Sequence, residues 1–159
     1  MPKMIYVGMG GNVGDVPATF ARAIEMLSGV VRMSSLWRTA PVGAVSAQPW
    51  FLNACVEVQR EDEPLAFLHE LQRIERELGR DRSREVPGGP RPIDLDWLLW
   101  DEREIDGLGL RVPHPRLAER AFALAPLVEL AGAHLMIPGA GRAGALLAGV
   151  LAKQEIERL

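Results

Sequence analysis

Apolar runs and amphipathic stretches alternate along the first 100 residues of the chain. Four short runs are apolar or alternate between apolar and polar residues, and glycine or proline flanks each of them, which predicts strands. The predicted strands are 4–9, 30–39, 50–59 and 93–100. Apolar residues recur at helical spacing after Asp15 and after Asp62, and these stretches end at Gly29 and Gly79, which predicts two helices. The order βαββαβ is that of an α+β, ferredoxin-like core.

Additional elements are expected after this core. Residues 101–113 resemble a turn and a short hairpin arm, and a helix is predicted from Pro115 to Gly132. The tail, 139–159, is rich in Gly, Ala and Leu and is expected to form a last helix. No internal repeat or linker is visible, so we expect 1–159 to be a single domain.

The predicted strand 50–59 has two different faces. The apolar face consists of Leu52, Ala54, Val56 and Val58, and we expect it in the core. The other face has mixed polarity and consists of Phe51, Asn53, Cys55 and Glu57. Since the helices of a ferredoxin-like fold cover one face of the sheet, the second face is expected to be available to a ligand.

Composition narrows the classes of function. Hydrophobic residues make up 48% and charged residues 25%, as in a folded globular chain. The net charge of −3 does not favour non-specific nucleic-acid binding. Cys55 alone forms neither an internal disulfide nor a cysteine zinc site, which fits a reducing compartment. No apolar run approaches the roughly 20 residues of a membrane span, so we expect a soluble, cytoplasmic protein with no membrane partner. Separately, we expect a monomer.

The strongest chemical signal is Asp94-Leu95-Asp96 in the predicted strand 93–100. Side chains at i and i+2 project from one face of a strand, so the two carboxylates emerge together, about 6.5–7 Å apart at their Cβ atoms. The opposite face is apolar and expected to be buried; it consists of Ile93, Leu95, Trp97 and Leu99. Paired carboxylates suit a divalent cation such as Mg²⁺, and the alternatives are two solvated acids or an acid paired with arginine.

An arginine-rich loop over 80–92 precedes these acids. Its arginines are Arg80, Arg82, Arg84 and Arg91. Guanidinium groups match phosphate oxygens bidentately, so arginines beside paired aspartates indicate phosphoryl transfer. The alternative is a charged surface loop neutralised by Asp81 and Glu85.

Each of three further polar residues has two possible roles. His114 lies between prolines at a predicted helix start, where it would bind a phosphate or cap the turn. Gln72 and Glu75 lie three residues apart on the polar side of their helix, where they would face a ligand or only solvent.

Several motifs occur together, in one order, over most of the chain. They are Gly10-Gly11-Asn12, WRTAPVG at 37–43, QPWFLNA at 48–54, QRIE at 72–75, GPRPIDLD at 89–96, VPH at 112–114 and RAF at 120–122. With these motifs the chain resembles the 6-hydroxymethyl-7,8-dihydropterin pyrophosphokinase family of folate biosynthesis. The resemblance implies transfer of a pyrophosphoryl group from ATP to the hydroxymethyl group of the pterin, with release of AMP.

The resemblance also implies roles for individual residues. Asp94 and Asp96 would bind two Mg²⁺ ions, and Arg82 and Arg91 would be catalytic with them. The implied ATP-binding residues are Gln72, Glu75, Arg80, Arg82, Arg91, His114 and Arg120. The implied pterin-binding residues are Thr39, Val42, Gly43, Phe51, Asn53 and Phe122, with the two phenylalanines stacked on either side of the ring.

The chain departs from the family pattern at several places, two of which lie in the expected pterin site and in the arginine loop. Phe51 stands where the family often has tyrosine, and Val86-Pro87-Gly88 stands where it commonly has tryptophan. We expect the loops 40–50 and 80–92 to close over ATP. The rival functions are a non-catalytic nucleotide- or pterin-binding module on this fold and a metal-dependent phosphohydrolase.

Overall fold

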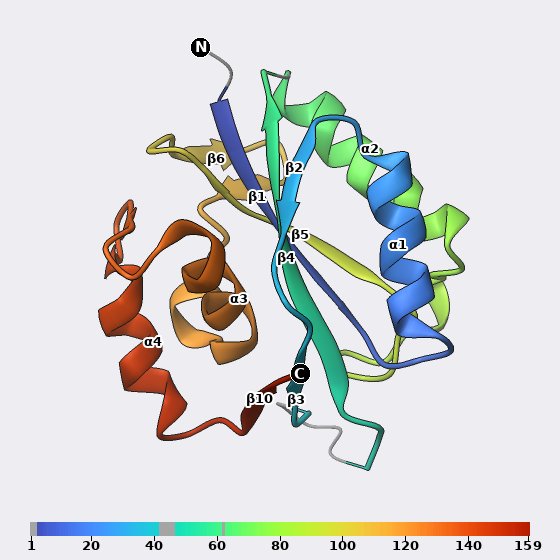
Figure 1. Ribbon diagram of the computed structural model, residues 1–159. Helices are drawn as coiled ribbons and strands as arrows, with labels where there is room; N and C mark the ends of the chain where they lie inside the picture. The colour runs from blue at the N-terminus through green and yellow to red at the C-terminus, as the bar shows by residue number, and fades with distance from the viewer. Residues whose placement is uncertain (1–2, 42–46, 62) are drawn as a thin grey trace.

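An antiparallel sheet forms the centre of the protein in a computed structural model that describes residues 3–41, 47–61 and 63–159 (Figure 1). Within these residues the strand order is β10-β3-β4-β1-β5, and β2 also pairs with β4. The strands are β1 (Lys3–Gly11), β2 (Val30–Met33), β3 (Trp37–Thr39), β4 (Phe51–Arg60), β5 (Asp94–Trp100) and β10 (Ile156–Arg158). The predicted α+β, ferredoxin-like order β1-α1-β2/β3-β4-α2-β5 is confirmed.

Helices cover both faces of this sheet. α1 (Val16–Met26) and α2 (Pro64–Glu77) pack on one face, while α3 (Ala121–Ala131) and α4 (Ala143–Leu151) lie on the other (Figure 1). Asp15 and Glu63 cap the first two helices by accepting the backbone N–H of Ala18 and Ala66. In the described part of the chain, no helix is long and apolar enough to cross a membrane.

The smaller elements connect these layers. They are η1 (Arg82–Arg84), β6 (Ile105–Gly107), β7 (Leu110–Val112), η2 (Leu117–Glu119), β8 (Met136–Ile137) and β9 (Gly141–Arg142). The hairpin predicted within 101–113 is confirmed as β6–β7. The predicted strand 30–39 is divided into β2 and β3, and the helix predicted from Pro115 begins only at Ala121, after η2.

The prediction of a single helix over 139–159 was wrong. Only 143–151 is helical, and β10 then pairs antiparallel with β3, where Ile156 lies opposite Thr39 and Arg158 opposite Trp37. A three-residue strand has little signal of its own, and this one is stabilised by pairing with a distant strand.

The expectation of an open second sheet face was also wrong for most of that face. Cys55 is fully buried in a cluster with Leu98, Leu124 and Leu127, beneath α3. Glu57 is buried too, and Arg32 Nη2 donates to it at 2.8 Å. The end of β4 that carries Phe51 and Asn53 lines a cavity, whereas the face farther along the strand, at Cys55, is covered by α3.

A β-bulge changes the face to which the second half of β5 points. Val7 lies opposite Trp97 and Tyr6 opposite Leu99, so Leu98 has no partner on β1. Trp97 packs with the α1–α2 side of the sheet, whereas Leu98 and Leu99 both pack with the α3 side. The expectation that Leu99 shares a face with Trp97 was therefore wrong, because the extra residue reverses the alternation.

Candidate active site

The two aspartates of β5 lie ahead of this bulge and project from the same face of the sheet. Asp94 lies opposite Gly10 of β1, and Asp96 lies opposite Gly8. Gly10 also lies opposite Asn53 of β4, and a Cβ atom added to Gly10 would be 2.8 Å from Asn53 Oδ1. The glycines therefore keep the sheet surface between the aspartates and Asn53 free of side chains.

The two carboxylates have different surroundings. Asp94 Oδ1 accepts a hydrogen bond of 2.8 Å from Arg80 Nη1, and Asp94 Oδ2 lies 3.7 Å from Arg91 Nη1. Asp96 has longer contacts, 3.8 Å to His114 Nε2 and 4.0 Å to Arg120 Nη1. Desolvation and the neighbouring Asp94 raise the pKa of Asp96 to about 7, against the opposite effect of Arg120.

This arrangement fits a magnesium site that is completed by a substrate. No group of three His, Cys, Asp or Glu residues with metal-binding geometry occurs among the described residues. Mg²⁺ commonly takes one or two carboxylates and fills its other positions with water and substrate phosphates. Asp94 and Asp96 supply that number of carboxylates, and a cation would offset the burial and the neighbouring Asp94 charge that raise the pKa of Asp96.

Behind Asp94, a buried ionic network connects α2, the arginine loop and β5. Glu75 Oε2 accepts the backbone N–H of Leu95 and Arg80 Nη1, both at 2.7 Å, and Glu75 Oε1 accepts Arg82 Nη2 at 2.8 Å. Arg80 also donates to Glu85 at 2.7 and 2.9 Å. Burial raises the pKa of Glu75, while the Leu95 N–H and the two arginines oppose that rise.

The reading of Glu75 as part of a solvated polar face is therefore wrong, since only 1% of the residue is exposed. Its partner Arg80, expected at the phosphates, is 6% exposed and already binds three carboxylates. Both residues line a hollow of about 470 Å³ that also contains Gln72 and Arg82.

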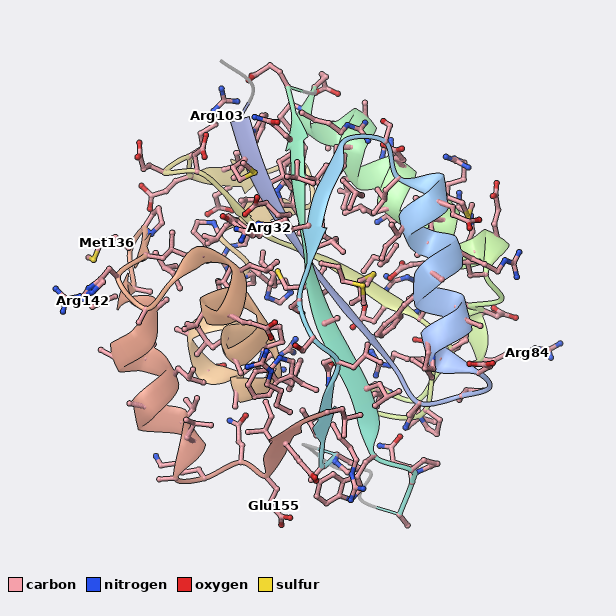
Figure 2. The ribbon with its side chains drawn as sticks, viewed as in Figure 1. Arg32, Arg84, Arg103, Met136, Arg142 and Glu155 are labelled. Carbon is pink, nitrogen blue, oxygen red and sulfur yellow. The ribbon has the colours of Figure 1, made fainter. Side chains whose placement is uncertain are left out.

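The other arginines of the loop differ in exposure. Arg84 points into solvent (Figure 2), and 88% of its side chain is exposed. Arg82 is 61% exposed while it contacts Glu75. Arg91 is only 18% exposed, donates to the Gly89 carbonyl at 3.2 Å and lines the cavity beside Asp94. Arg91 is therefore the loop arginine that lines the cavity and also lies within ion-pair distance of Asp94.

A cavity of about 410 Å³ brings together most of the residues expected to bind the pterin. The expected site residues that line it are Thr39, Phe51, Asn53, Arg91, Asp94, Arg120 and Phe122. Asn53 Nδ2 donates to the Thr39 hydroxyl at 2.8 Å, and both residues are buried. This bond fixes the Asn53 amide and leaves its carbonyl oxygen beside Gly10. Val42 and Gly43, also expected here, lie outside the described residues.

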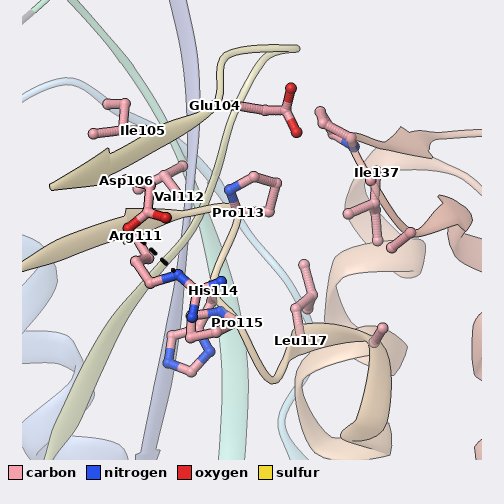
Figure 3. Close-up of a pocket in the computed structure, with 14 residues that line it drawn as sticks. Glu104, Ile105, Asp106, Arg111, Val112, Pro113, His114, Pro115, Leu117 and Ile137 are labelled. Atoms are coloured by element: carbon pink, nitrogen blue, oxygen red, sulfur yellow. Dashed lines mark ion pairs between the residues drawn. The ribbon is translucent and has the colours of Figure 1, made fainter.

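His114 lines a second cavity. Its Nδ1 accepts the backbone N–H of Arg116 at 3.2 Å, so in the neutral ring the proton lies on Nε2, which points toward Asp96. Burial and the positive charge of Arg120 lower the pKa of His114 to about 4. The cavity behind it, about 350 Å³, is bounded by β6–β7 and by the segment around Ile137 (Figure 3).

One positioning residue, Asn12, was not predicted for this site. Its backbone N–H donates to the Arg91 carbonyl, and its Oδ1 accepts the Arg91 N–H, both at 3.0 Å. Its Nδ2 donates to Gln48 Oε1 and to the Pro49 carbonyl, each at 2.9 Å. Asn12 thereby ties the arginine loop to the start of β4. The only sequence signal was its place in the Gly10-Gly11-Asn12 turn, which does not reveal distant partners.

Comparisons with known proteins agree with this geometry. The model of the 7,8-dihydro-6-hydroxymethylpterin-pyrophosphokinase (HPPK) family matches residues 6–132. A 2-amino-4-hydroxy-6-hydroxymethyldihydropteridine pyrophosphokinase of Bacillus subtilis (strain 168) is 42% identical over 135 residues, which cover 82% of this chain and 79% of that protein. A protein of the same name from Methylorubrum extorquens is 41% identical over 131 residues, with 79% and 81% coverage.

Solved structures agree at the level of the fold. The wild-type HPPK-DHPS of Plasmodium falciparum superposes with a TM-score of 0.71 at 12% identity, covering 96% of this chain and 42% of that one. The chain thus spans less than half of the length of that larger protein, and the likeness concerns the fold. The match over 6–132 and the curated relatives above 40% identity show that this chain belongs to the 7,8-dihydro-6-hydroxymethylpterin-pyrophosphokinase family.

Proposed function

We propose that the described site transfers pyrophosphate from ATP to the hydroxymethyl group of 6-hydroxymethyl-7,8-dihydropterin, with release of AMP. The observation that supports this most strongly is that Asp94 lines the same cavity as Phe51, Asn53 and Phe122. A flat heterocycle with polar edges suits two aromatic side chains and a fixed amide. Its hydroxymethyl group would then reach the carboxylates of β5.

The phosphates would lie between the aspartates and the cationic side chains around them. Asp94 and Asp96 would hold Mg²⁺, which supplies charge neutralisation for the phosphates and for the entering and leaving oxygens. Arg91 and Arg120, each near one aspartate, would bind phosphate oxygens, and exposed Arg82 would join them after leaving Glu75. Neutral His114 would donate from Nε2 to a phosphate oxygen.

The remaining ATP contacts belong to the same proposal. Gln72 lines the hollow on the α2 side and would face the nucleotide. Glu75 and Arg80 would contribute to nucleotide binding while they stay in their ionic network, because their charged groups already have partners. The binding of two Mg²⁺ ions, the monomeric state, the cytoplasmic location and closure of the loops remain predictions.

The product identifies the reaction. Incubating the full chain with Mg²⁺, ATP and the hydroxymethyl dihydropterin should give AMP in step with pterin diphosphate. Asp96→Asn should fold like the wild type but lose turnover by roughly a hundred-fold or more, because half of the carboxylate charge at the metal site is gone. Release of inorganic phosphate without pterin would instead indicate a phosphohydrolase, and calorimetric binding of both substrates without AMP would indicate a non-catalytic module.

A further inference from the structure

The C-terminal segment of the chain contacts two walls of the pterin cavity. Beyond the pairing of β10 with β3, the backbone N–H of Ala40 donates to the Glu155 carbonyl at 3.1 Å. Thr39 and Ala40 both line the cavity. Since the family match ends at residue 132, this segment lies outside the part of the chain that the family model covers.

Gln154 connects the same segment to the opposite wall. Its Oε1 accepts the backbone N–H of Ala121 at 2.8 Å, and its Nε2 donates to the Glu119 carbonyl at 2.7 Å. These two backbone groups flank Arg120 on either side. Both polar ends of one half-buried side chain are therefore used to hold the junction between η2 and α3.

This junction has no local capping group. The first N–H groups of a helix need acceptors, and Arg120 at the N-cap position makes no side-chain capping bond, because a guanidinium can only donate. Gln154 provides the acceptor from 33 residues farther along the chain. The first N–H group of α3, that of Ala121, thus depends on the C-terminal segment for its acceptor.

The residues at this junction are those expected to touch the substrates. Arg120 and Phe122 both line the cavity, and Arg120 Cζ lies 5.3 Å from the centre of the Phe122 ring. Arg120 has a second anchor in Asp96. A shift at the start of α3 would therefore displace Phe122 more than Arg120, and with it the surface against which the pterin would stack.

We infer that Gln154 is a positioning residue for pterin binding. It fixes the first turn of α3 so that Phe122 keeps its place in the cavity wall, while β10 holds the Thr39 wall. The choice of ligand rests on the proposed function, but the two hydrogen bonds of Gln154 do not depend on it.

The test compares Gln154→Ala with Glu155→Ala in the full chain. The Glu155 side chain points away from the protein (Figure 2), so the control changes the neighbouring position without removing a bridge. In Gln154→Ala the Ala121 amide should exchange with solvent faster, and the KM for the pterin should rise about three- to ten-fold, as for the loss of one to two hydrogen bonds. The KM for ATP should change by less than about two-fold, since Arg120 keeps its contact with Asp96.

A conservative variant separates the two bonds. Gln154→Glu keeps an acceptor for the Ala121 N–H and loses the donor to the Glu119 carbonyl, so its pterin KM should lie between those of the wild type and Gln154→Ala. If Gln154→Ala does not fold, Gln154→Glu is compared with Glu155→Ala instead. Calorimetric titration with the pterin and a non-hydrolysable ATP analogue gives the same ranking without turnover.

Two results would overturn the inference. The first is an unchanged pterin KM and affinity in Gln154→Ala despite faster exchange at Ala121, which would make the bridge purely structural. The second is an equal rise of the KM for both substrates. A wild type that forms no AMP would contradict the proposed function, whereas a normal wild type with an unaffected Gln154→Ala would contradict only this inference.

Discussion

Replacing Glu75 by Gln would leave three hydrogen-bond donors facing a neutral amide at a position almost closed to water. The Glu75 side chain is 2% exposed and accepts from the Leu95 N–H, Arg80 and Arg82 at 2.7–2.8 Å. The amide keeps one acceptor oxygen, but its NH₂ end would have to face an arginine. We expect Glu75→Gln to destabilise the native protein more than any other single loss of charge on α2.

The size of this effect follows from the partners that remain. Removing one member of a buried ion pair typically costs about 3–5 kcal/mol. Arg80 retains two hydrogen bonds to Glu85 and one to Asp94, and the Leu95 N–H retains an acceptor, which places the effect at the lower end. We therefore expect the free energy of unfolding to fall by about 3 kcal/mol at neutral pH.

The same helix provides the control. Glu77 lies two residues after Glu75 and pairs with Arg73 at 3.1 Å, but the side chains of this pair are 50% and 48% exposed. Exposed pairs contribute less than about 1 kcal/mol, so Glu77→Gln should unfold almost like the wild type. Urea denaturation followed by tryptophan fluorescence measures all three proteins. Equal unfolding free energies for the two variants would refute the reasoning, because they would mean that Glu75 is uncharged in the native protein.

Three further changes test other parts of the structure. Gly10→Ala would place a Cβ atom 2.8 Å from Asn53 Oδ1 and push the Asn53 amide out of alignment. The KM for the pterin should therefore rise roughly ten-fold, and an unchanged KM would contradict this. Gly149 lies inside α4, and a Cβ atom added there would meet nothing within 4 Å beyond the neighbouring backbone of its own helix, so Gly149→Ala should raise stability by about 0.5–1 kcal/mol. A lower thermal midpoint would show otherwise. Burial would raise the pKa of Glu129, but hydrogen bonds from Ser35 and Trp37 hold it below the usual 4.5. The contribution of Glu129 to the free energy of unfolding is therefore complete above pH 4.5 and is lost as the pH falls through the lower native pKa. In acid, the stability of Glu129→Gln should consequently depend less on pH than that of the wild type. Parallel profiles of stability against pH would exclude this role.

The sequence predicted best where the relevant signal was local. Strand and helix order followed from periodicity, and the shared face of Asp94 and Asp96 followed from alternation over three residues. Alternation failed at Leu99 because a bulge depends on the pairing with β1, which the sequence of β5 alone does not contain. The signal was thus reliable only up to the first irregularity in pairing.

Other features depended on partners far along the chain. Glu75 looked like a solvated residue because helical periodicity cannot show that Arg80 and the Leu95 N–H lie against it. β10 looked like the end of a helix because its strand character comes from pairing with β3. Gln154 carried no signal at all, since its two partners are backbone groups 33 and 35 residues away.

The unpaired Leu98 lets β5 direct two consecutive leucines into the cluster under α3. Asp94 and Asp96 project from one face of the sheet before the bulge, and Leu98 and Leu99 both pack on the α3 side after it. Deleting Leu98 would restore regular pairing without turning over either half of the strand, because Trp97 and Leu99 would keep Val7 and Tyr6 as their partners. The loss would then be that of one buried leucine side chain under α3, and not a reversal of the two faces.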